Sequence, residues 1–258
     1  MLKENLKFED SDIFEGMPSI SAVIKSIELR KSDRKITRIL FDKEKIKSKF
    51  KELSFLKVKS QQMDFLIEYV SSEMISDTVI GTTHGGIVAE CSPRTYSRLT
   101  NEKIKPAGVY YLLDGIEDPY NFGNAVRSLY AAGADGLIVG ERNWLGVSGV
   151  VARSSAGASE LIDIFVSDTV SAVEFFKKMD YTVICAGIRD SVSIFETDLS
   201  APILVVLGGE KRGISRAILD RANKIVRIDY GTDFKGSLSA SASASVFAFE
   251  ILRYNLKK

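Results

Sequence analysis

An apolar run that stops at two glycines constrains this chain more than any other stretch. Residues 204–207 read Leu-Val-Val-Leu, and Gly208-Gly209-Glu210-Lys211-Arg212-Gly213 follow directly. A β-branched run of this kind predicts a buried strand, and the glycines let the backbone approach a ligand closely where the strand ends. Open α/β sheets bind ligands at such strand ends. A plain turn explains the glycines equally well, so this motif alone leaves both interpretations open.

Strand and helix patterns alternate through the second half of the chain. The predicted strands cover residues 109–113, 137–140, 162–166, 181–186, 204–207 and 225–228, and the stretches between them have apolar residues at helical spacing. The serine- and alanine-rich residues 239–245 lead into an apolar helical pattern that ends near Glu250, so we expect a last helix with a small-residue start. This order predicts an α/β fold with a mostly parallel sheet.

A smaller α/β domain is expected at the N-terminal end. We predict helices over residues 19–30, 43–51 and 61–74, strands over 36–41 and 55–59, and a glycine-containing loop before a strand near residue 90. Residues 93–107 contain Pro93, Pro106 and little periodicity, which is typical of a linker. The expected organisation is an N-terminal domain over residues 1–92, a linker over 93–107 and a second domain over 108–258.

The charge of the chain is unevenly distributed, although the formal net charge is only +1. Residues 25–59 hold 13 Lys and Arg against 5 Asp and Glu, a net charge of +8, which leaves −7 for the remainder. A basic segment of this kind is compatible with a domain that contacts nucleic-acid phosphates. A solvated, lysine-rich surface is the alternative.

Several classes of protein and site are disfavoured. No apolar run approaches the roughly 18 residues of a membrane span, and residues 1–5 lack the apolar core of a secretory signal. Cys91 and Cys185 give neither a disulfide framework nor metal-ligand spacing, and we expect a cytoplasmic protein. His84 has no second ligand at metal spacing, so a contact with RNA or no role fits it better. A P-loop and a dinucleotide-binding glycine motif are both missing.

A polar motif follows the predicted strand at 109–113. Residues 114–128 read Asp-Gly-Ile-Glu-Asp-Pro-Tyr-Asn-Phe-Gly-Asn-Ala-Val-Arg-Ser. We expect Asn121 to cap a helix that stops at Gly133. Arg127 would then lie on the face of this helix that approaches the loop, where a guanidinium can bind a phosphate. A plain surface arginine is the alternative.

Three ordered blocks resemble the motifs of the SpoU family, also called TrmH, of RNA ribose 2′-O-methyltransferases. The first is the Asn-x-Gly-x-x-x-Arg pattern that ends at Arg127, the second covers residues 207–214, and the third runs from Ile228 through Ser237-Leu238-Ser239 to Glu250. Residues 153–160 also resemble the connecting segment of the family. The resemblance covers about residues 108–254, and the order and separation of its blocks make it specific.

The resemblance implies S-adenosylmethionine as the cofactor, no metal, a homodimer, and a parallel sheet whose C-terminal part forms a trefoil knot. Cofactor contacts are implied at Ala186, Gly187, Leu207, Gly208, Gly209, Gly213, Ile228, Tyr230 and Leu238. Catalytic positions are implied at Arg127, Asn121, Glu210, Ser237 and Ser239. Arg127 would bind phosphate and stabilise a developing alkoxide, because a guanidinium keeps its proton in proteins. Glu210 is the alternative proton acceptor.

Two residues depart from the family pattern. Ser239 stands where the family has Asn, and Asp229 stands where it has Pro. Either change is compatible with altered target choice, slower chemistry, or a member that binds RNA without methylating it.

The N-terminal domain resembles the RNA-binding domains of ribosomal-RNA members, which look like a large-subunit ribosomal protein, and residues 85–89 match best. We therefore expect a 2′-O-methyltransferase that acts on rRNA in preference to tRNA, with no DNA or membrane partner. A tRNA methyltransferase and a non-catalytic RNA-binding protein of the same fold are the alternatives.

Overall fold

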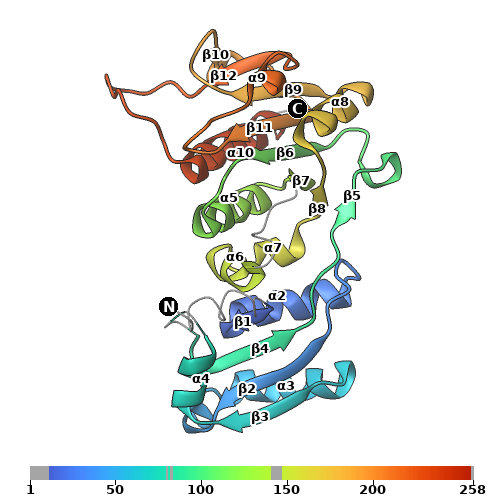
Figure 1. Cartoon of the computed structure of the whole chain (residues 1–258), viewed down its shortest axis with the longest axis vertical. Coiled ribbons are helices and arrows are strands. Elements are labelled where there is room, and N and C mark those ends of the chain that lie inside the picture. Colours follow the sequence, from blue (N-terminus) through green and yellow to red (C-terminus); the bar gives the residue numbers. More distant parts are fainter. Residues whose placement is uncertain (1–11, 80, 82–83, 141–146, 257–258) are drawn as a thin grey trace. The chain divides into compact units, whose positions relative to one another are not determined.

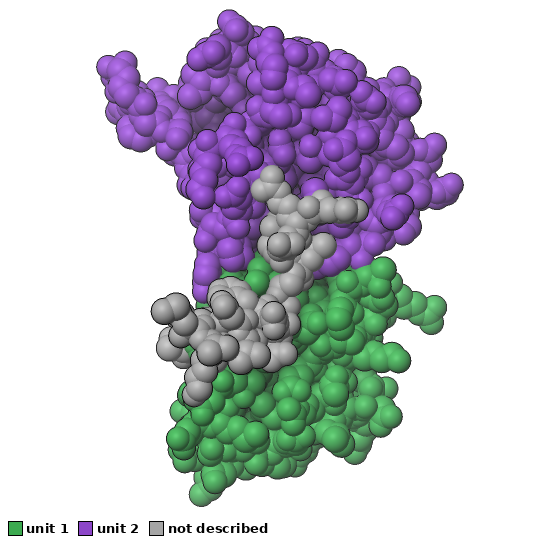
Figure 2. Space-filling view, in the orientation of Figure 1, with its two compact units in different colours: residues 1–95, 143–161 green, residues 96–142, 162–258 purple. Residues whose placement is uncertain are grey.

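The structure is a computed structural model that describes residues 12–79, 81, 84–140 and 147–256. Contacts divide the chain into two compact units, which are coloured separately in Figure 2. The first unit comprises residues 1–95 and 143–161, and the second comprises residues 96–142 and 162–258. The expectation about a signal at residues 1–5 falls outside the described residues.

The first unit is built on a four-stranded mixed sheet (Figure 1). Its strands are β1 (Ile13–Glu15), β2 (Ile36–Asp42), β3 (Leu66–Val70) and β4 (Ile87–Cys91), in the order β1-β4-β2-β3. The pair β2 and β3 is parallel, whereas β4 runs antiparallel to both β1 and β2. The helices are α2 (Gly16–Glu28), the 3-10 turn η1 (Lys43–Lys45), α3 (Phe50–Met63) and α4 (Ser72–Thr78). The smaller α/β domain expected from the sequence is therefore present.

Three elements of this unit differ from the sequence-based expectation. The predicted helix over 43–51 is replaced by η1, a turn over residues 46–49 and the start of α3. Residues 55–59, predicted as a strand, lie inside α3, and the predicted helix over 61–74 is replaced by the end of α3, then β3 and α4. The alternation Phe-Leu-Lys-Val-Lys is typical of a strand, but the buried residues are Leu53 and Leu56, three apart on one helical face. Asp64, in the left-handed conformation, ends α3 and frees the following residues to pair with β2.

The second unit contains an eight-stranded sheet in which every strand pair is parallel. The strand order is β10-β12-β9-β11-β6-β7-β8-β5. The bounds are β5 (Ser97–Arg98), β6 (Val109–Asp114), β7 (Gly136–Val139), β8 (Ile164–Val166), β9 (Thr182–Ala186), β10 (Val192–Ser193), β11 (Ile203–Gly208) and β12 (Lys224–Arg227). The mostly parallel sheet predicted from the alternation is confirmed.

Helices cover this sheet and bury its central strands. They are α5 (Pro119–Ala131), α8 (Thr169–Lys178), α9 (Arg216–Leu219) and α10 (Ala240–Asn255), with short turns at η2 (Asn101–Lys103) and η4 (Ile194–Glu196). Residues 203–207 of β11 are all at most 1% exposed. A strand buried on both faces needs apolar side chains at every position, which explains the unbroken apolar run in the sequence.

The predicted linker contributes to the second unit. Within it, β5 pairs with β8 at the edge of the sheet, and Ile104 is buried in the core. The carbonyl oxygen of Lys105 accepts a hydrogen bond from the hydroxyl of Tyr181, so this segment is anchored to the residue that precedes β9. A segment with two prolines and little periodicity can still pack, because irregular backbone needs only a few apolar contacts and hydrogen bonds to be held.

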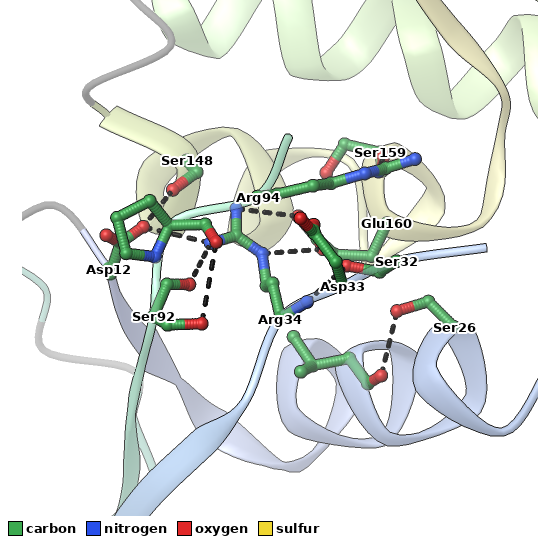
Figure 3. A network of polar contacts seen from close by, with 12 residues as sticks. Asp12, Ser26, Ser32, Asp33, Arg34, Ser92, Arg94, Ser148, Ser159 and Glu160 are labelled. Carbon is green, nitrogen blue, oxygen red and sulfur yellow. Dashed lines mark hydrogen bonds and ion pairs between the residues drawn. The ribbon is translucent and has the colours of Figure 1, made fainter. Parts of the chain in front are cut away.

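Residues 147–161, which lie between β7 and β8 in the chain, group with the first unit. Here α6 (Ser148–Ser154) and α7 (Ala158–Leu161) pack against β1 and α2, and Arg34 fastens them (Figure 3). Its Nε donates to Glu160 Oε2 at 3.0 Å, while its Nη1 donates to Asp12 Oδ1 at 2.9 Å and to the carbonyl oxygen of Ser92 at 2.8 Å. The predicted division at residues 92 and 108 assigns residues 147–161 to the second domain, and this division stays a prediction.

Candidate active site

The candidate site lies where the strand order of the large sheet changes direction. Strand β6 has β7, its successor in the chain, on one side and the distant β11 on the other. In register, Asp114 at the end of β6 faces Gly208 at the end of β11. Such a switch point opens a crevice outside the carboxyl ends of the strands, and it is the usual ligand site of open α/β sheets.

Two loops are fastened to each other at this edge. The amide of Gly209 donates to the carbonyl oxygen of Asp114 at 2.7 Å, and Asn121 Nδ2 donates to Glu210 Oε1 at 3.2 Å. Lys211 and Glu117 form an exposed ion pair at 3.1 Å. A Cβ atom on Gly209 would lie 1.9 Å from the carbonyl oxygen of Gly115, so only glycine permits this approach. The predicted catalytic residues Asn121 and Glu210 are therefore in direct contact.

The helix that carries Asn121 begins earlier than expected. Asp118 is its N-cap, with Oδ1 accepting from the amide of Asn121 at 2.7 Å, and Pro119 occupies the first turn. The prediction that Asn121 caps this helix is wrong, because an Asp-Pro pair supplies a better cap and first helical residue. The consequence is that the side chain of Asn121 is free to bond Glu210.

Arg127 lies on the exposed side of α5. Its guanidinium forms no hydrogen bond or ion pair with any residue in the part of the chain that the structure describes. Asn124, three residues earlier, is also exposed. An unpaired guanidinium keeps all five of its N–H donors available to a ligand.

The residues expected to hold the cofactor follow adjacent strands. Strands β12, β9 and β11 are neighbours in the sheet, and β6 is next to β11. Six of the nine positions are half-buried, namely Ala186, Gly187, Gly208, Ile228, Tyr230 and Leu238, whereas Leu207 and Gly209 are buried and Gly213 is exposed. A Cβ atom on Gly187 would lie 2.9 Å from Ile225 Cγ2, which shows how closely β9 and β12 pack at this edge.

The segment between β12 and α10 makes a long excursion without regular structure (Figure 1). The hydroxyl of Tyr230 accepts a hydrogen bond from the amide of Leu238 at 3.3 Å and so holds the two ends of this segment together. Ser239 is the N-cap of α10, with Oγ accepting from the amide of Ala242 at 3.2 Å. Ser237 is exposed. The third block thus places Leu238 beside Tyr230 and uses Ser239 to start the last helix.

The carboxylate of Asp229 is already occupied. Arg227 Nε donates to its Oδ1 at 2.7 Å, and the other side of that guanidinium donates to the carbonyl oxygen of Ser191 at 2.6 Å. A hydrogen bond from the Ser193 side chain and the Arg227 pair lower the pKa of Asp229 below its ordinary value. The residue that replaces the family's Pro therefore joins β12 to the β10 edge and adds no free carboxylate.

The structure thus joins Asn121 to Glu210 and Tyr230 to Leu238. Among the described residues, no hydrogen bond or ion pair connects Arg127 or Ser237 to these pairs. Two contributors were missed in the sequence analysis: the Asp118 cap and the Lys211–Glu117 pair. The Asp-Pro dipeptide was a usable signal for the cap. Nothing in the sequence indicates an ion pair between two loops 94 residues apart.

Within the described ranges, no group of three or more His, Cys, Asp or Glu side chains is placed to hold a metal ion. The same residues include no helix long and apolar enough to cross a bilayer.

The parallel sheet, its switch point and the fastened loops define a ligand-binding α/β enzyme domain joined to a smaller mixed-sheet unit. A family model described as the SpoU rRNA Methylase family matches residues 108–249. A protein of Bacillus subtilis (strain 168), named as a TrmH family tRNA/rRNA methyltransferase, is 26% identical over 233 residues, which cover 88% of this chain and 92% of that protein.

Solved structures show the same fold. The AdoMet-bound rRNA methyltransferase from Sinorhizobium meliloti has a TM-score of 0.76 at 22% identity, and it covers 95% of this chain and 88% of that one. A structure described as an RNA 2′-O ribose methyltransferase has a TM-score of 0.74 at 21% identity, with the same coverage. The chain belongs to the SpoU rRNA methylase family and is an RNA methyltransferase of the SpoU/TrmH kind. The trefoil knot is an expectation of this fold.

Proposed function

We propose that this protein transfers the methyl group of S-adenosylmethionine to a ribose 2′-hydroxyl of RNA, with rRNA as its substrate. The observation that carries the proposal is the hydrogen bond between Asn121 and Glu210. It joins the first and second family motifs at the ends of β6 and β11, where an α/β sheet binds its ligand. Homodimerisation and a cytoplasmic location belong to the same proposal.

The edge formed by β12, β9 and β11 fits an adenosine-containing cofactor. Ala186, Ile228 and Leu238 are half-buried apolar residues that leave accessible surface beside backbone polar groups, which is the usual composition of a small-molecule site. Glycines at 187 and 208 allow a ligand to approach the backbone. When bound, S-adenosylmethionine supplies an activated methyl group on its sulfonium.

The chain's own residues would position the RNA and manage its charge. The unpaired guanidinium of Arg127 binds an RNA phosphate and stabilises negative charge that develops on the ribose oxygen. Glu210 accepts the hydroxyl proton, and Asn121 orients its carboxylate through the 3.2 Å hydrogen bond. Because the transfer is an in-line displacement, much of the rate enhancement comes from holding the hydroxyl in position.

The preference for rRNA rests on architecture. The neighbour described as an rRNA methyltransferase matches 95% of the chain and therefore includes a unit like the smaller one here. The 2′-hydroxyl as acceptor is supported by the neighbour described as a 2′-O ribose methyltransferase. The Bacillus relative is named for both tRNA and rRNA, so the choice between them is a point for experiment.

The test is a methyl-transfer assay with the purified full chain, labelled S-adenosylmethionine, and unmodified rRNA and tRNA transcripts. Alkaline cleavage of RNA requires a free 2′-hydroxyl, so ribose methylation leaves the label in alkali-resistant dinucleotides. We expect labelled dinucleotides from rRNA. Label released as mononucleotides would show base methylation, and label confined to tRNA would overturn the rRNA preference.

A calorimetric titration with S-adenosylmethionine separates binding from chemistry. We expect micromolar binding to the wild-type protein. If cofactor and RNA both bind but no methyl group is transferred to any RNA, the catalytic proposal fails and the non-catalytic RNA-binding alternative replaces it.

A further inference from the structure

Some basic side chains of residues 25–59 are neutralised by ion pairs, and others are available to a ligand. Arg34, Arg38, Lys49 and Lys59 each form an ion pair with an acidic side chain. Five lysines along η1 and α3 are exposed, and their ammonium groups form no ion pair or hydrogen bond within the described ranges: Lys43, Lys45, Lys47, Lys51 and Lys57. Glu44 is the only acidic residue between 43 and 58 outside an ion pair. Five available lysines thus lie close together in the chain, within residues 43–57.

That segment also exposes an aromatic ring. The amide of Lys49 bonds the carbonyl of Lys45 at 2.8 Å, so helical geometry connects η1 to α3. Leu53 and Leu56 are buried on one side, while Phe50 is 67% exposed and Val58 is 53% exposed. The ring of Phe55 already has a cationic neighbour, since Lys59 Nζ lies 5.7 Å from its centroid. Phe50, one residue from Lys51 and three from Lys47, is therefore the free ring of this basic surface.

A glycine loop adjoins the same surface. The amide of Asp42 donates to the carbonyl oxygen of Gly86 at 2.8 Å, and a Cβ atom on Gly86 would lie 3.0 Å from Lys45 Cγ. His84 Nδ1 accepts from the amide of Gly86 at 3.1 Å, and Gly85 is exposed with φ +62°. The single histidine of the chain thus lies in a loop that packs against η1.

We propose that η1 and the first turns of α3 form a binding site for a single-stranded segment of the RNA substrate. The lysines neutralise successive phosphates, and an unstacked base packs on the ring of Phe50. The inference rests on the proposed function, because it assigns the RNA that the methyltransferase unit modifies to this surface. An RNA partner fits better than a protein partner, since lysine is depleted in protein interfaces, whereas lysines interspersed with an exposed aromatic ring are typical of RNA-binding surfaces.

The experiment measures the affinity of the full chain for an unmodified rRNA transcript at several salt concentrations. The test variant is the double substitution Lys47→Glu with Lys51→Glu. Its matched control is Lys25→Glu with Lys35→Glu, which changes the net charge equally at two exposed lysines of the same unit. We expect the test variant to lose at least tenfold in affinity and to lower the salt slope by roughly 1 to 2, while the control loses much less.

Phe50 separates stacking from charge. We expect Phe50→Ala to weaken RNA binding by roughly 5- to 100-fold without changing the salt slope. Phe50→Trp keeps an aromatic ring and should bind RNA about as tightly as the wild type. Cofactor titration of each variant reports on the methyltransferase unit independently. Equal losses in the test and control variants, or an unaffected Phe50→Ala protein, would overturn the site while leaving an active methyltransferase intact. A wild-type protein that neither binds nor methylates RNA would overturn the proposed function as well.

Discussion

Arg34 and Arg127 show two opposite uses of the same side chain. The Arg34 side chain is 1% exposed and is paired with Glu160, which is 2% exposed, and with Asp12. Arg127 is exposed and has no partner among the described residues. The partners of a charge, and not its presence, distinguish a structural arginine from one available to a ligand.

The buried arginine needs its partners because removing a guanidinium from water is costly unless every donor is satisfied. Its Nε and Nη2 face the two carboxylate oxygens of Glu160, its Nη1 bonds Asp12 and the carbonyl oxygen of Ser92, and its Cζ lies 4.8 Å from the ring centroid of Phe14. The network joins four segments of the first unit. Removing one partner therefore leaves the others with unpaired buried charge.

The largest effect is expected from Arg34→Met. Methionine replaces the guanidinium with an apolar group on an unbranched side chain and leaves the buried Glu160 carboxylate without its partner. We therefore expect the free energy of unfolding to fall by about 3–5 kcal/mol. Denaturant unfolding followed by circular dichroism measures it. The double variant Arg34→Met with Glu160→Leu should recover part of the loss, since an apolar pair has no charge to desolvate. A single variant as stable as the wild type would show that the pair contributes nothing.

Arg127→Ala should have the next largest effect, and on a different quantity. We expect the rate of methyl transfer to fall by roughly 10²- to 10³-fold, because a group that stabilises transition-state charge is lost. The free energy of unfolding should change by less than about 0.5 kcal/mol, as is usual for an exposed side chain without partners. Labelled methyl transfer and denaturant unfolding of the same protein preparation give both numbers.

The variant Arg127→Lys is the conservative control. A lysine keeps the charge but not the planar fork of donors, so its rate should lie between those of the wild type and Arg127→Ala. Loss of cofactor affinity in the Arg127→Ala protein would indicate instead that Arg127 supports the cofactor site.

The large sheet was predictable because its strands are buried on both faces. The apolar runs that became β6, β9 and β11 carry this constraint in every residue. The error at residues 55–59 arose where burial is one-sided, because Leu53 and Leu56 alone decide whether the segment is a helix. Edge strands such as β10, with two residues, carry no local signal. The membership of α6 and α7 in the first unit depends on Arg34 and Glu160, whose separation of 126 residues leaves no local pattern.

The site was predictable at the level of motifs and not of contacts. The resemblance indicated Asn121 and Glu210 as site residues. Only the folded chain shows that Asp118 caps the helix, which leaves the side-chain amide of Asn121 to bond Glu210. The same holds for the two departures from the family pattern. Ser239 and Asp229 were unexplained in the sequence, whereas the structure gives each a local partner.

A smaller effect is expected from Ser239→Ala. The serine hydroxyl satisfies an amide in the first turn of α10, and loss of such a cap destabilises a protein by about 1 kcal/mol. Ser239→Asn should be nearly neutral in stability, because Asn and Ser cap helices about equally well. Thermal or denaturant unfolding of the two variants tests this. If Ser239→Asn raises methyl transfer from nothing to a measurable rate, the residue limits catalysis and is more than a cap.

The smallest effect is expected from Asp229→Asn. The ion pair of Asp229 with Arg227 is intermediate in exposure between the buried Arg34 network and the exposed Arg127. The Asp229 and Arg227 side chains are both 37% exposed. Solvent therefore weakens the attraction within this pair more than it weakens the attraction between the buried Arg34 and Glu160. Since the pKa of Asp229 is lowered in the folded protein, its carboxylate stabilises the fold above the unfolded-state pKa, and this contribution disappears as the pH falls through the folded-state pKa. The difference in unfolding free energy between wild type and variant should therefore be present at pH 7 and stay constant down to about pH 4, near the unfolded-state pKa. It should then decline, and disappear as the pH falls through the lower folded-state pKa of Asp229. Unfolding curves measured from about pH 7 down to about pH 2 give this difference directly. A difference that increased on acidification would have the wrong sign, and would mean that Asp229 is held in a site that favours its protonated form.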